Sequence, residues 1–157
     1  IMSASSAATE PSRIRKTALA AVESYSDWNI TSVMSYRSAK CSHEVLPKSL
    51  GRPPLNNEEY ARHFASMLPW FRNFKVTIND TFVDEKANKV VFWAQSTAET
   101  DIGPYTNEYM LVLYLNEEGD KVDRFLEFVD VGVSMGFLPK LNKYIEKELG
   151  AQNKIKL

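Results

Sequence analysis

Apolar residues recur at helical spacing in the first part of the chain. From Ser12 to Trp28 they return every three or four positions, which predicts an amphipathic helix. Residues 31–36 are expected to form a short second helix. A further helix should begin after Asn56, because Glu59 lies three positions later and completes a capping box.

The period of the pattern then changes to two, which is typical of strands. Strands are expected at residues 41–46, 74–83, 89–100, 105–115 and 122–130. Turn-forming segments rich in Asn, Asp and Gly separate the later strands. A final helix should follow, with Pro139 in its first turn and Gly150 at its end.

This order of elements predicts an α+β fold. Long antiparallel strands twist and coil rather than lie flat, and helices packed on the concave face leave a cavity. Such a cavity is the default place for a ligand. The expected organisation is a flexible leader at residues 1–11, one domain at 12–150 and a tail at 151–157.

The predicted pairing of the last two strands assigns side chains to faces. Tight turns place Asn107 opposite Asp130 and Tyr109 opposite Phe128, so these four residues should share the face that lines the cavity. The other face, which includes Phe125, is also apolar and needs a cover. A second subunit could provide it, so a homodimer is expected. A shift of one residue would exchange the two faces.

Composition and charge narrow the class of protein. The chain is 44% hydrophobic and 25% charged, which is ordinary for a globular protein. A net charge of −1 gives no reason to expect nucleic acid or an anionic membrane as a partner. No secretory signal and no membrane-spanning segment is expected, so the predicted location is the cytoplasm.

No motif in the sequence indicates a cofactor or a metal. The two histidines lack partners at ligand spacing, and no glycine-rich phosphate loop occurs. The single cysteine, Cys41, excludes an intrachain disulfide and fits a reducing compartment. A buried apolar role is favoured for it over that of a nucleophile.

Four fragments carry a family resemblance. They are CSHEVLP at 41–47, NEEY at 57–60, GPYTNEY at 103–109 and EFVD at 127–130. In this order they resemble a fungal subgroup of the SnoaL-like branch of the NTF2-like superfamily. That subgroup is similar to the cofactor-free isomerases of fungal meroterpenoid and alkaloid pathways. The resemblance implies a cone of curved sheet and helices around one central pocket.

Three residues are candidates for catalysis. The resemblance implies an acid/base carboxylate at Asp130, whose pKa would rise in an apolar pocket; the alternative is a cap on the final helix. His43 can exchange a proton near neutral pH, or it is a buried histidine bonded to backbone. Tyr109 can donate to a developing oxyanion, or it is core packing with a satisfied hydroxyl.

Other residues are candidates for holding a substrate. Asn107 and Tyr105 share the expected pocket face with Tyr109, and Arg37 could bind an anionic oxygen or form an internal salt bridge. The expected pocket walls are Trp28, Met67, Phe71 and Phe128. In contrast, Glu108 and Glu127 are expected on the opposite face, at an interface or in salt bridges, and His63 is expected on the surface.

The function that these observations favour is an isomerase or cyclase. It would use general acid/base catalysis on a small hydrophobic intermediate derived from a polyketide, meroterpenoid or alkaloid. The alternatives are a binding module without chemistry, and a dehydratase or hydrolase in the same pocket. Two or more ionisable groups that converge in the cavity would favour an enzyme, whereas a wholly apolar lining would favour binding.

Overall fold

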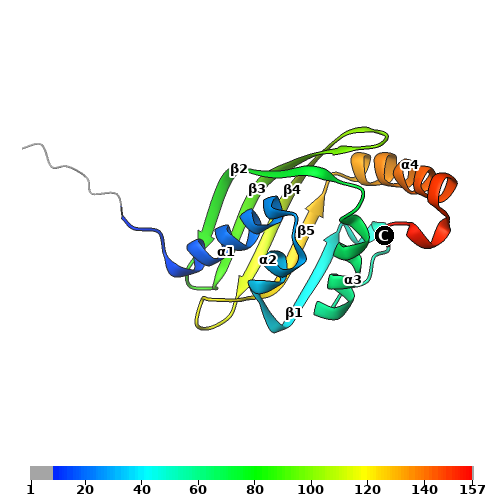
Figure 1. The fold of residues 1–157 in the computed structure, drawn as a ribbon. Coiled ribbons are helices and arrows are strands. Elements are labelled where there is room, and N and C mark those ends of the chain that lie inside the picture. The colour runs from blue at the N-terminus through cyan, green and yellow to red at the C-terminus, as the bar shows by residue number, and fades with distance from the viewer. Residues whose placement is uncertain (1–8, 157) are drawn as a thin grey trace, which may run out of the picture.

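The fold is that of a computed structural model that describes residues 9–156, so the expected leader lies largely outside the described residues. Three helices lie over one face of a five-stranded sheet, and a fourth follows the last strand (Figure 1). The helices are α1 (Arg13–Glu23), α2 (Ile30–Ser35), α3 (Asn57–Met67) and α4 (Val131–Leu149), with short 3-10 turns η1 (Ser24–Asp27), η2 (Lys48–Leu50) and η3 (Ala151–Asn153). The strands are β1 (Arg37–Leu46), β2 (Arg72–Asp84), β3 (Lys89–Thr100), β4 (Gly103–Leu115) and β5 (Val122–Val129). The predicted α+β fold is confirmed.

The strand order in the sheet is β1-β5-β4-β3-β2. Strands β2 to β5 form the predicted antiparallel meander. Strand β1 begins at Arg37, earlier than predicted, and pairs in parallel with β5. This pairing is possible because α3 and strands β2 to β4 lie between β1 and β5 in the sequence. They give the chain the long crossover connection that a parallel pair requires.

The sequence signals at the starts of the first and third helices act as predicted. Ser12 caps α1 by accepting the backbone N–H of Arg15. Asn56 and Glu59 form the predicted capping box of α3. Both helices turn their apolar stripes toward the sheet, and Ile14, Tyr60 and Phe64 are among the buried residues.

The final helix begins well before Pro139, which corrects the predicted start. Asp130 is its N-cap, and Asp130 Oδ1 accepts the N–H groups of Gly132 and Val133 at 2.7 and 3.3 Å. A capping carboxylate satisfies N–H groups that otherwise lack partners, so it starts the helix directly after β5. Gly150, with φ of 93°, ends the helix as predicted.

The register of β4 and β5 differs from the prediction by one residue. Leu115 pairs with Val122, but Tyr114 pairs with Arg124, so Asp123 is an extra residue in β5. This β-bulge shifts every later pair, and Tyr109 lies opposite Val129 rather than Phe128. The faces of β5 are therefore exchanged relative to the prediction.

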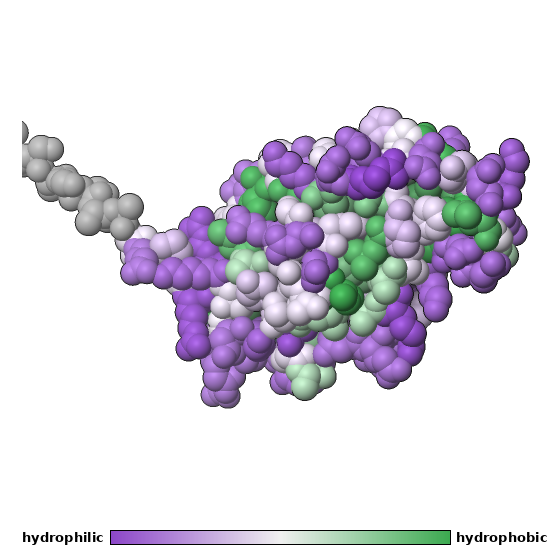
Figure 2. All heavy atoms as spheres, viewed as in Figure 1, coloured by the Kyte–Doolittle hydropathy of each residue, from purple (hydrophilic) through white to green (hydrophobic). Residues whose placement is uncertain are grey.

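The core lies between the helices and the inner face of the sheet. Buried side chains from α1 meet those of β3, β4 and β5 there. On the helix-covered side, polar residues dominate the outline of the molecule, and apolar residues show in the middle of the face (Figure 2). Within residues 9–156, no helix is long and apolar enough to cross a membrane.

Candidate active site

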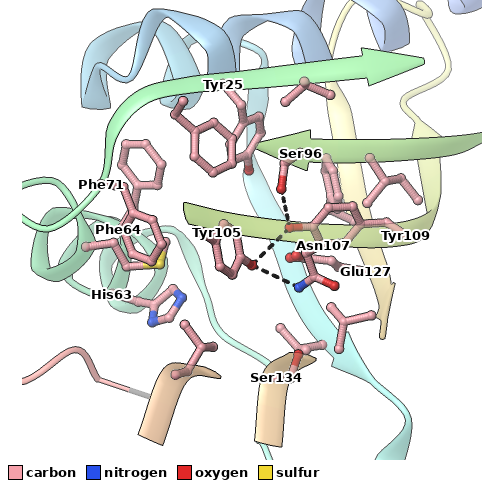
Figure 3. A pocket seen from close by; sticks show the side chains of 18 of the residues that line it. Tyr25, His63, Phe64, Phe71, Ser96, Tyr105, Asn107, Tyr109, Glu127 and Ser134 are labelled. Atoms are coloured by element: carbon pink, nitrogen blue, oxygen red, sulfur yellow. Dashed lines mark hydrogen bonds between the residues drawn. The ribbon is translucent and has the colours of Figure 1, made fainter. Parts of the chain in front are cut away.

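A cavity of about 110 Å³ lies between the helices and the inner face of the sheet. Most of its lining is apolar, and it includes the predicted wall residues Trp28, Met67 and Phe71. The predicted residues Tyr105, Asn107 and Tyr109 of β4 also line it (Figure 3). Their substrate-binding and catalytic roles stay predictions.

Glu127 is the carboxylate of this cavity. The bulge in β5 turns it inward, opposite Leu111 of β4. Its side chain is 26% exposed, and its Oε2 atom accepts a hydrogen bond from Nε2 of His43 at 2.9 Å. The cavity therefore contains one carboxylate, which His43 orients through a hydrogen bond and which is also accessible from the cavity.

His43 lies behind Glu127 and is fully enclosed. Its ring stacks between the rings of Tyr60 and Phe125, at centroid distances of 4.2 and 4.7 Å. Arg37 donates a hydrogen bond to Nδ1 of His43 at 3.3 Å. Since Arg37 can only donate, Nδ1 is the acceptor and Nε2 carries the proton. The ring is thus fixed in the tautomer that donates to Glu127.

Arg37 is held in this position from two sides. Its Nε atom donates to Oδ1 of Asn57 at 2.8 Å, and its guanidinium lies 4.3 Å from the centre of the Tyr60 ring. Arg37 does not line the cavity. Neither predicted role of Arg37, a hold on substrate or a salt bridge, matches its contacts. It supports His43 instead.

Burial and charge set the protonation of the pair. Burial lowers the pKa of His43, and this outweighs the opposite effect of Glu127. Burial alone would raise the pKa of Glu127, but the hydrogen bond and charge of His43, with Arg52 and His63, bring it below its usual value. A neutral imidazole therefore donates to an ionised carboxylate, which is the form that can accept a proton.

A chain of hydroxyl groups lies beside Glu127 (Figure 3). Asn107 Nδ2 donates a hydrogen bond to the hydroxyl of Tyr105 at 2.9 Å. The Tyr105 hydroxyl is hydrogen-bonded to the Tyr109 hydroxyl at 3.3 Å, and the Tyr109 hydroxyl to the Ser96 hydroxyl at 2.8 Å. Three hydroxyl protons serve two bonds between hydroxyls, so one proton is left for a ligand. Burial raises the pKa of both tyrosines, so they remain donors.

Asp130 and Phe128 lie outside the cavity, so the positions predicted for them are wrong. The Asp130 carboxylate is exposed and caps α4. Phe128 is 49% exposed on the opposite face of the sheet. Both errors have one cause, because the bulge at Asp123 turns residues 127 and 129 inward and 128 outward.

The sequence pattern missed several residues of the site. Glu127 was assigned to the opposite face, although it lies in the EFVD fragment. His63 was expected on the surface but lines the cavity, and Arg52 and Ser96 line it as well. Cys41 is buried, as expected of a small apolar residue. Among residues 9–156, no group of three or more His, Cys, Asp or Glu could hold a metal ion.

A curved sheet, helices over its inner face and a pocket with one oriented carboxylate define a protein of the NTF2-like class. The chain matches no family model. The solved structure of the BvnE pinacolase from Penicillium brevicompactum is similar, with a TM-score of 0.81 and 31% identity over 85% of this chain and 97% of that one. Solved members of the SnoaL-like branch share the fold.

Curated relatives come from fungi. Austinoid biosynthesis clusters protein H of Penicillium brasilianum is 33% identical over 87% of this chain and 93% of its own length. Monooxygenase nsrQ of Aspergillus novofumigatus is 32% identical over 87% of both chains. The chain belongs to the family of fungal secondary-metabolite cluster proteins that includes these relatives, and its fold is the SnoaL-like, NTF2-like one.

Proposed function

We propose that this protein is an isomerase or cyclase that works by general acid/base catalysis without a cofactor. Its substrate would be a small hydrophobic intermediate of fungal secondary metabolism, derived from a polyketide, meroterpenoid or alkaloid. The observation that carries the proposal is the ionised carboxylate of Glu127, which faces an apolar cavity and is oriented by neutral His43. This pair replaces Asp130 as the proposed acid/base group.

In this mechanism, one proton moves through Glu127. The carboxylate removes a proton from an acidic C–H or O–H group of the substrate and returns it at another atom, so the product is an isomer. His43, as a neutral donor, holds the carboxylate in place throughout. The hydroxyl chain from Tyr105 to Ser96 has one O–H group that bonds no other hydroxyl. This group donates a hydrogen bond to the substrate oxygen that gains negative charge.

Three other functions are alternatives. The mostly apolar lining would also suit a module that only binds a metabolite. Several relatives are named monooxygenases, which suggests an oxygenation. The convergence of Glu127, His63 and Arg52 on the cavity favours an enzyme over a binding module. A dehydratase or hydrolase would use the same carboxylate to move a proton to or from water.

The mass of the product separates these functions. A strain lacking the gene should accumulate the substrate, which can be purified and incubated with the protein after dialysis against EDTA. In H₂O a product of unchanged mass is expected. In D₂O the product should carry deuterium at the carbon that is reprotonated, to the extent that the proton on Glu127 exchanges with solvent before it is returned. A product lighter or heavier by one water would indicate a dehydratase or hydrolase, and one heavier by one oxygen a monooxygenase. Tight binding without turnover would indicate a binding module.

Glu127→Gln tests the catalytic group. The amide keeps the shape of the side chain but cannot take up a proton, so kcat should fall by roughly a hundredfold to ten-thousandfold. Glu108→Gln is the matched control, because Glu108 lies on the opposite face of the sheet and accepts a hydrogen bond from Trp93. Its kcat should be unchanged. A Glu127→Gln enzyme with nearly full activity would contradict the proposed mechanism.

A further inference from the structure

Arg52 is a half-buried arginine that faces the cavity from a loop between η2 and α3. The loop is anchored to β1, because Leu55 exchanges two backbone hydrogen bonds with His43 at 2.9 and 2.8 Å. Arg52 is therefore placed at the cavity wall by the same strand residue that orients Glu127.

A second cavity, of about 230 Å³, adjoins the first. The two share Val45, Arg52 and His63 in their linings, so these residues stand at the boundary. The second cavity is the more basic, since Arg62 and Lys156 also line it and Glu59 is its one carboxylate. The first cavity is thus bordered, at Arg52 and His63, by a second one with more cationic side chains in its lining.

The carboxylates nearby have other partners. Glu59 accepts the backbone N–H of Asn56 at 2.9 Å, and Glu127 accepts the hydrogen bond from His43. Arg62 is paired with Glu58 at 2.6 Å. Among the residues that the structure describes, Arg52 has neither a hydrogen bond nor an ion pair. The Arg52 nitrogens are not among the buried side-chain atoms that lack a partner, so solvent reaches them and they are free to bind a ligand.

We propose that Arg52 binds a carboxylate on the substrate, whose apolar body fills the first cavity. The inference builds on the proposed function and names the chemical class of its substrate. The guanidinium fork matches a carboxylate and forms charge-assisted hydrogen bonds with it. Arg52 stands where the two cavities meet, so a carboxylate bound there leaves the apolar body in the first cavity, which Glu127 lines. This fixes which part of the apolar body meets Glu127.

A pair of probes of equal shape tests this assignment. 2-Naphthaleneacetic acid is ionised at pH 7, and 2-naphthaleneacetamide is its neutral isostere. Calorimetric titration of the full chain should show roughly tenfold tighter binding of the acid, as expected for a charge-assisted contact. Arg52→Gln should remove the preference, and Arg52→Lys should retain part of it. The control Arg62→Gln, which changes a paired arginine of the second cavity, should retain it.

The ratio of the two affinities is internal to each variant, so a modest loss of stability does not affect it. Equal affinity of the wild type for both probes, or binding of neither at millimolar concentration, overturns the proposal. A preference that persists in Arg52→Gln also overturns it. Glu127→Gln should keep or increase the preference for the acid even if turnover is lost. Failure of the Arg52 assignment is thus distinguishable from failure of the catalytic proposal.

Discussion

At the scale of single residues, the environment gives two nearby carboxylates different roles. Glu127 and Asp130 are three positions apart, and only Glu127 lies in the cavity. The neutral ring of His43 accepts a hydrogen bond from Arg37 and donates one to Glu127. Glu127 is thus stabilised in its ionised form by a neutral donor and not by an imidazolium. The positive charge of Arg37 thus contacts the imidazole and not the carboxylate.

The buried histidine makes the stability of the fold depend on pH. Its pKa in the folded state lies below the ordinary 6.5, so the unfolded chain binds a proton that the native state does not. The contribution of His43 to the free energy of unfolding should therefore be complete above about pH 6.5 and decrease as the pH falls below 6.5. Urea denaturation between pH 5 and 7.5 measures this slope.

His43→Gln should reduce the slope, because the titrating group is removed. His63 has a lowered pKa as well and adds a slope of the same sign, so His63→Gln is the parallel control. Each single variant should lose part of the slope and the double variant most of it. A His43→Gln protein with the wild-type slope would show that folding does not lower the pKa of His43.

At the scale of elements, the final helix begins at its N-cap, Asp130, and continues through a proline. Its carboxylate caps a helix whose interior contains Pro139. Asp130→Ala should cost roughly 1 kcal/mol of unfolding free energy, and Asp130→Asn much less, because asparagine is also a good cap. Both variants should retain kcat, since the side chain is outside the cavity. Denaturation curves and turnover of the same samples check both points. Loss of activity in a stable Asp130→Asn protein would make Asp130 a catalytic candidate again.

The register of one strand pair limits what the sequence could predict. The existence and order of the strands and helices followed from their periods and caps, although the starts of β1 and α4 did not. Tyr105, Asn107 and Tyr109 were placed correctly because β4 is regular. The pairing of β5 was predicted from turn length alone. The turn residues do not reveal that Asp123 is inserted as a bulge, and one inserted residue exchanges the faces. The carboxylate that lines the cavity is therefore Glu127 and not Asp130, three positions later in the chain.

At the scale of the whole molecule, the outer face of the sheet remains apolar. Trp93, Met110 and Phe128 pair side by side across β3, β4 and β5 and are 42%, 39% and 49% exposed. A second row on the same face is formed by Phe82, Val91, Val112 and Leu126. Contiguous apolar area of this kind is typical of an interaction surface.

We expect a second copy of the chain to cover this face. Two identical faces are self-complementary, and a net charge of −1 opposes their contact only weakly. A stable interface buries on the order of 1,600 Å² in total, and its core excludes charge. Sedimentation at micromolar concentration should show a dimer, and Phe128→Glu should shift it to monomer by placing a carboxylate in the centre. Met135→Glu is the matched control, because Met135 is an exposed apolar residue that belongs to α4 and not to the sheet, and its variant should stay dimeric. A wild-type protein that sediments only as a monomer would show that solvent, and not a partner subunit, covers the outer face.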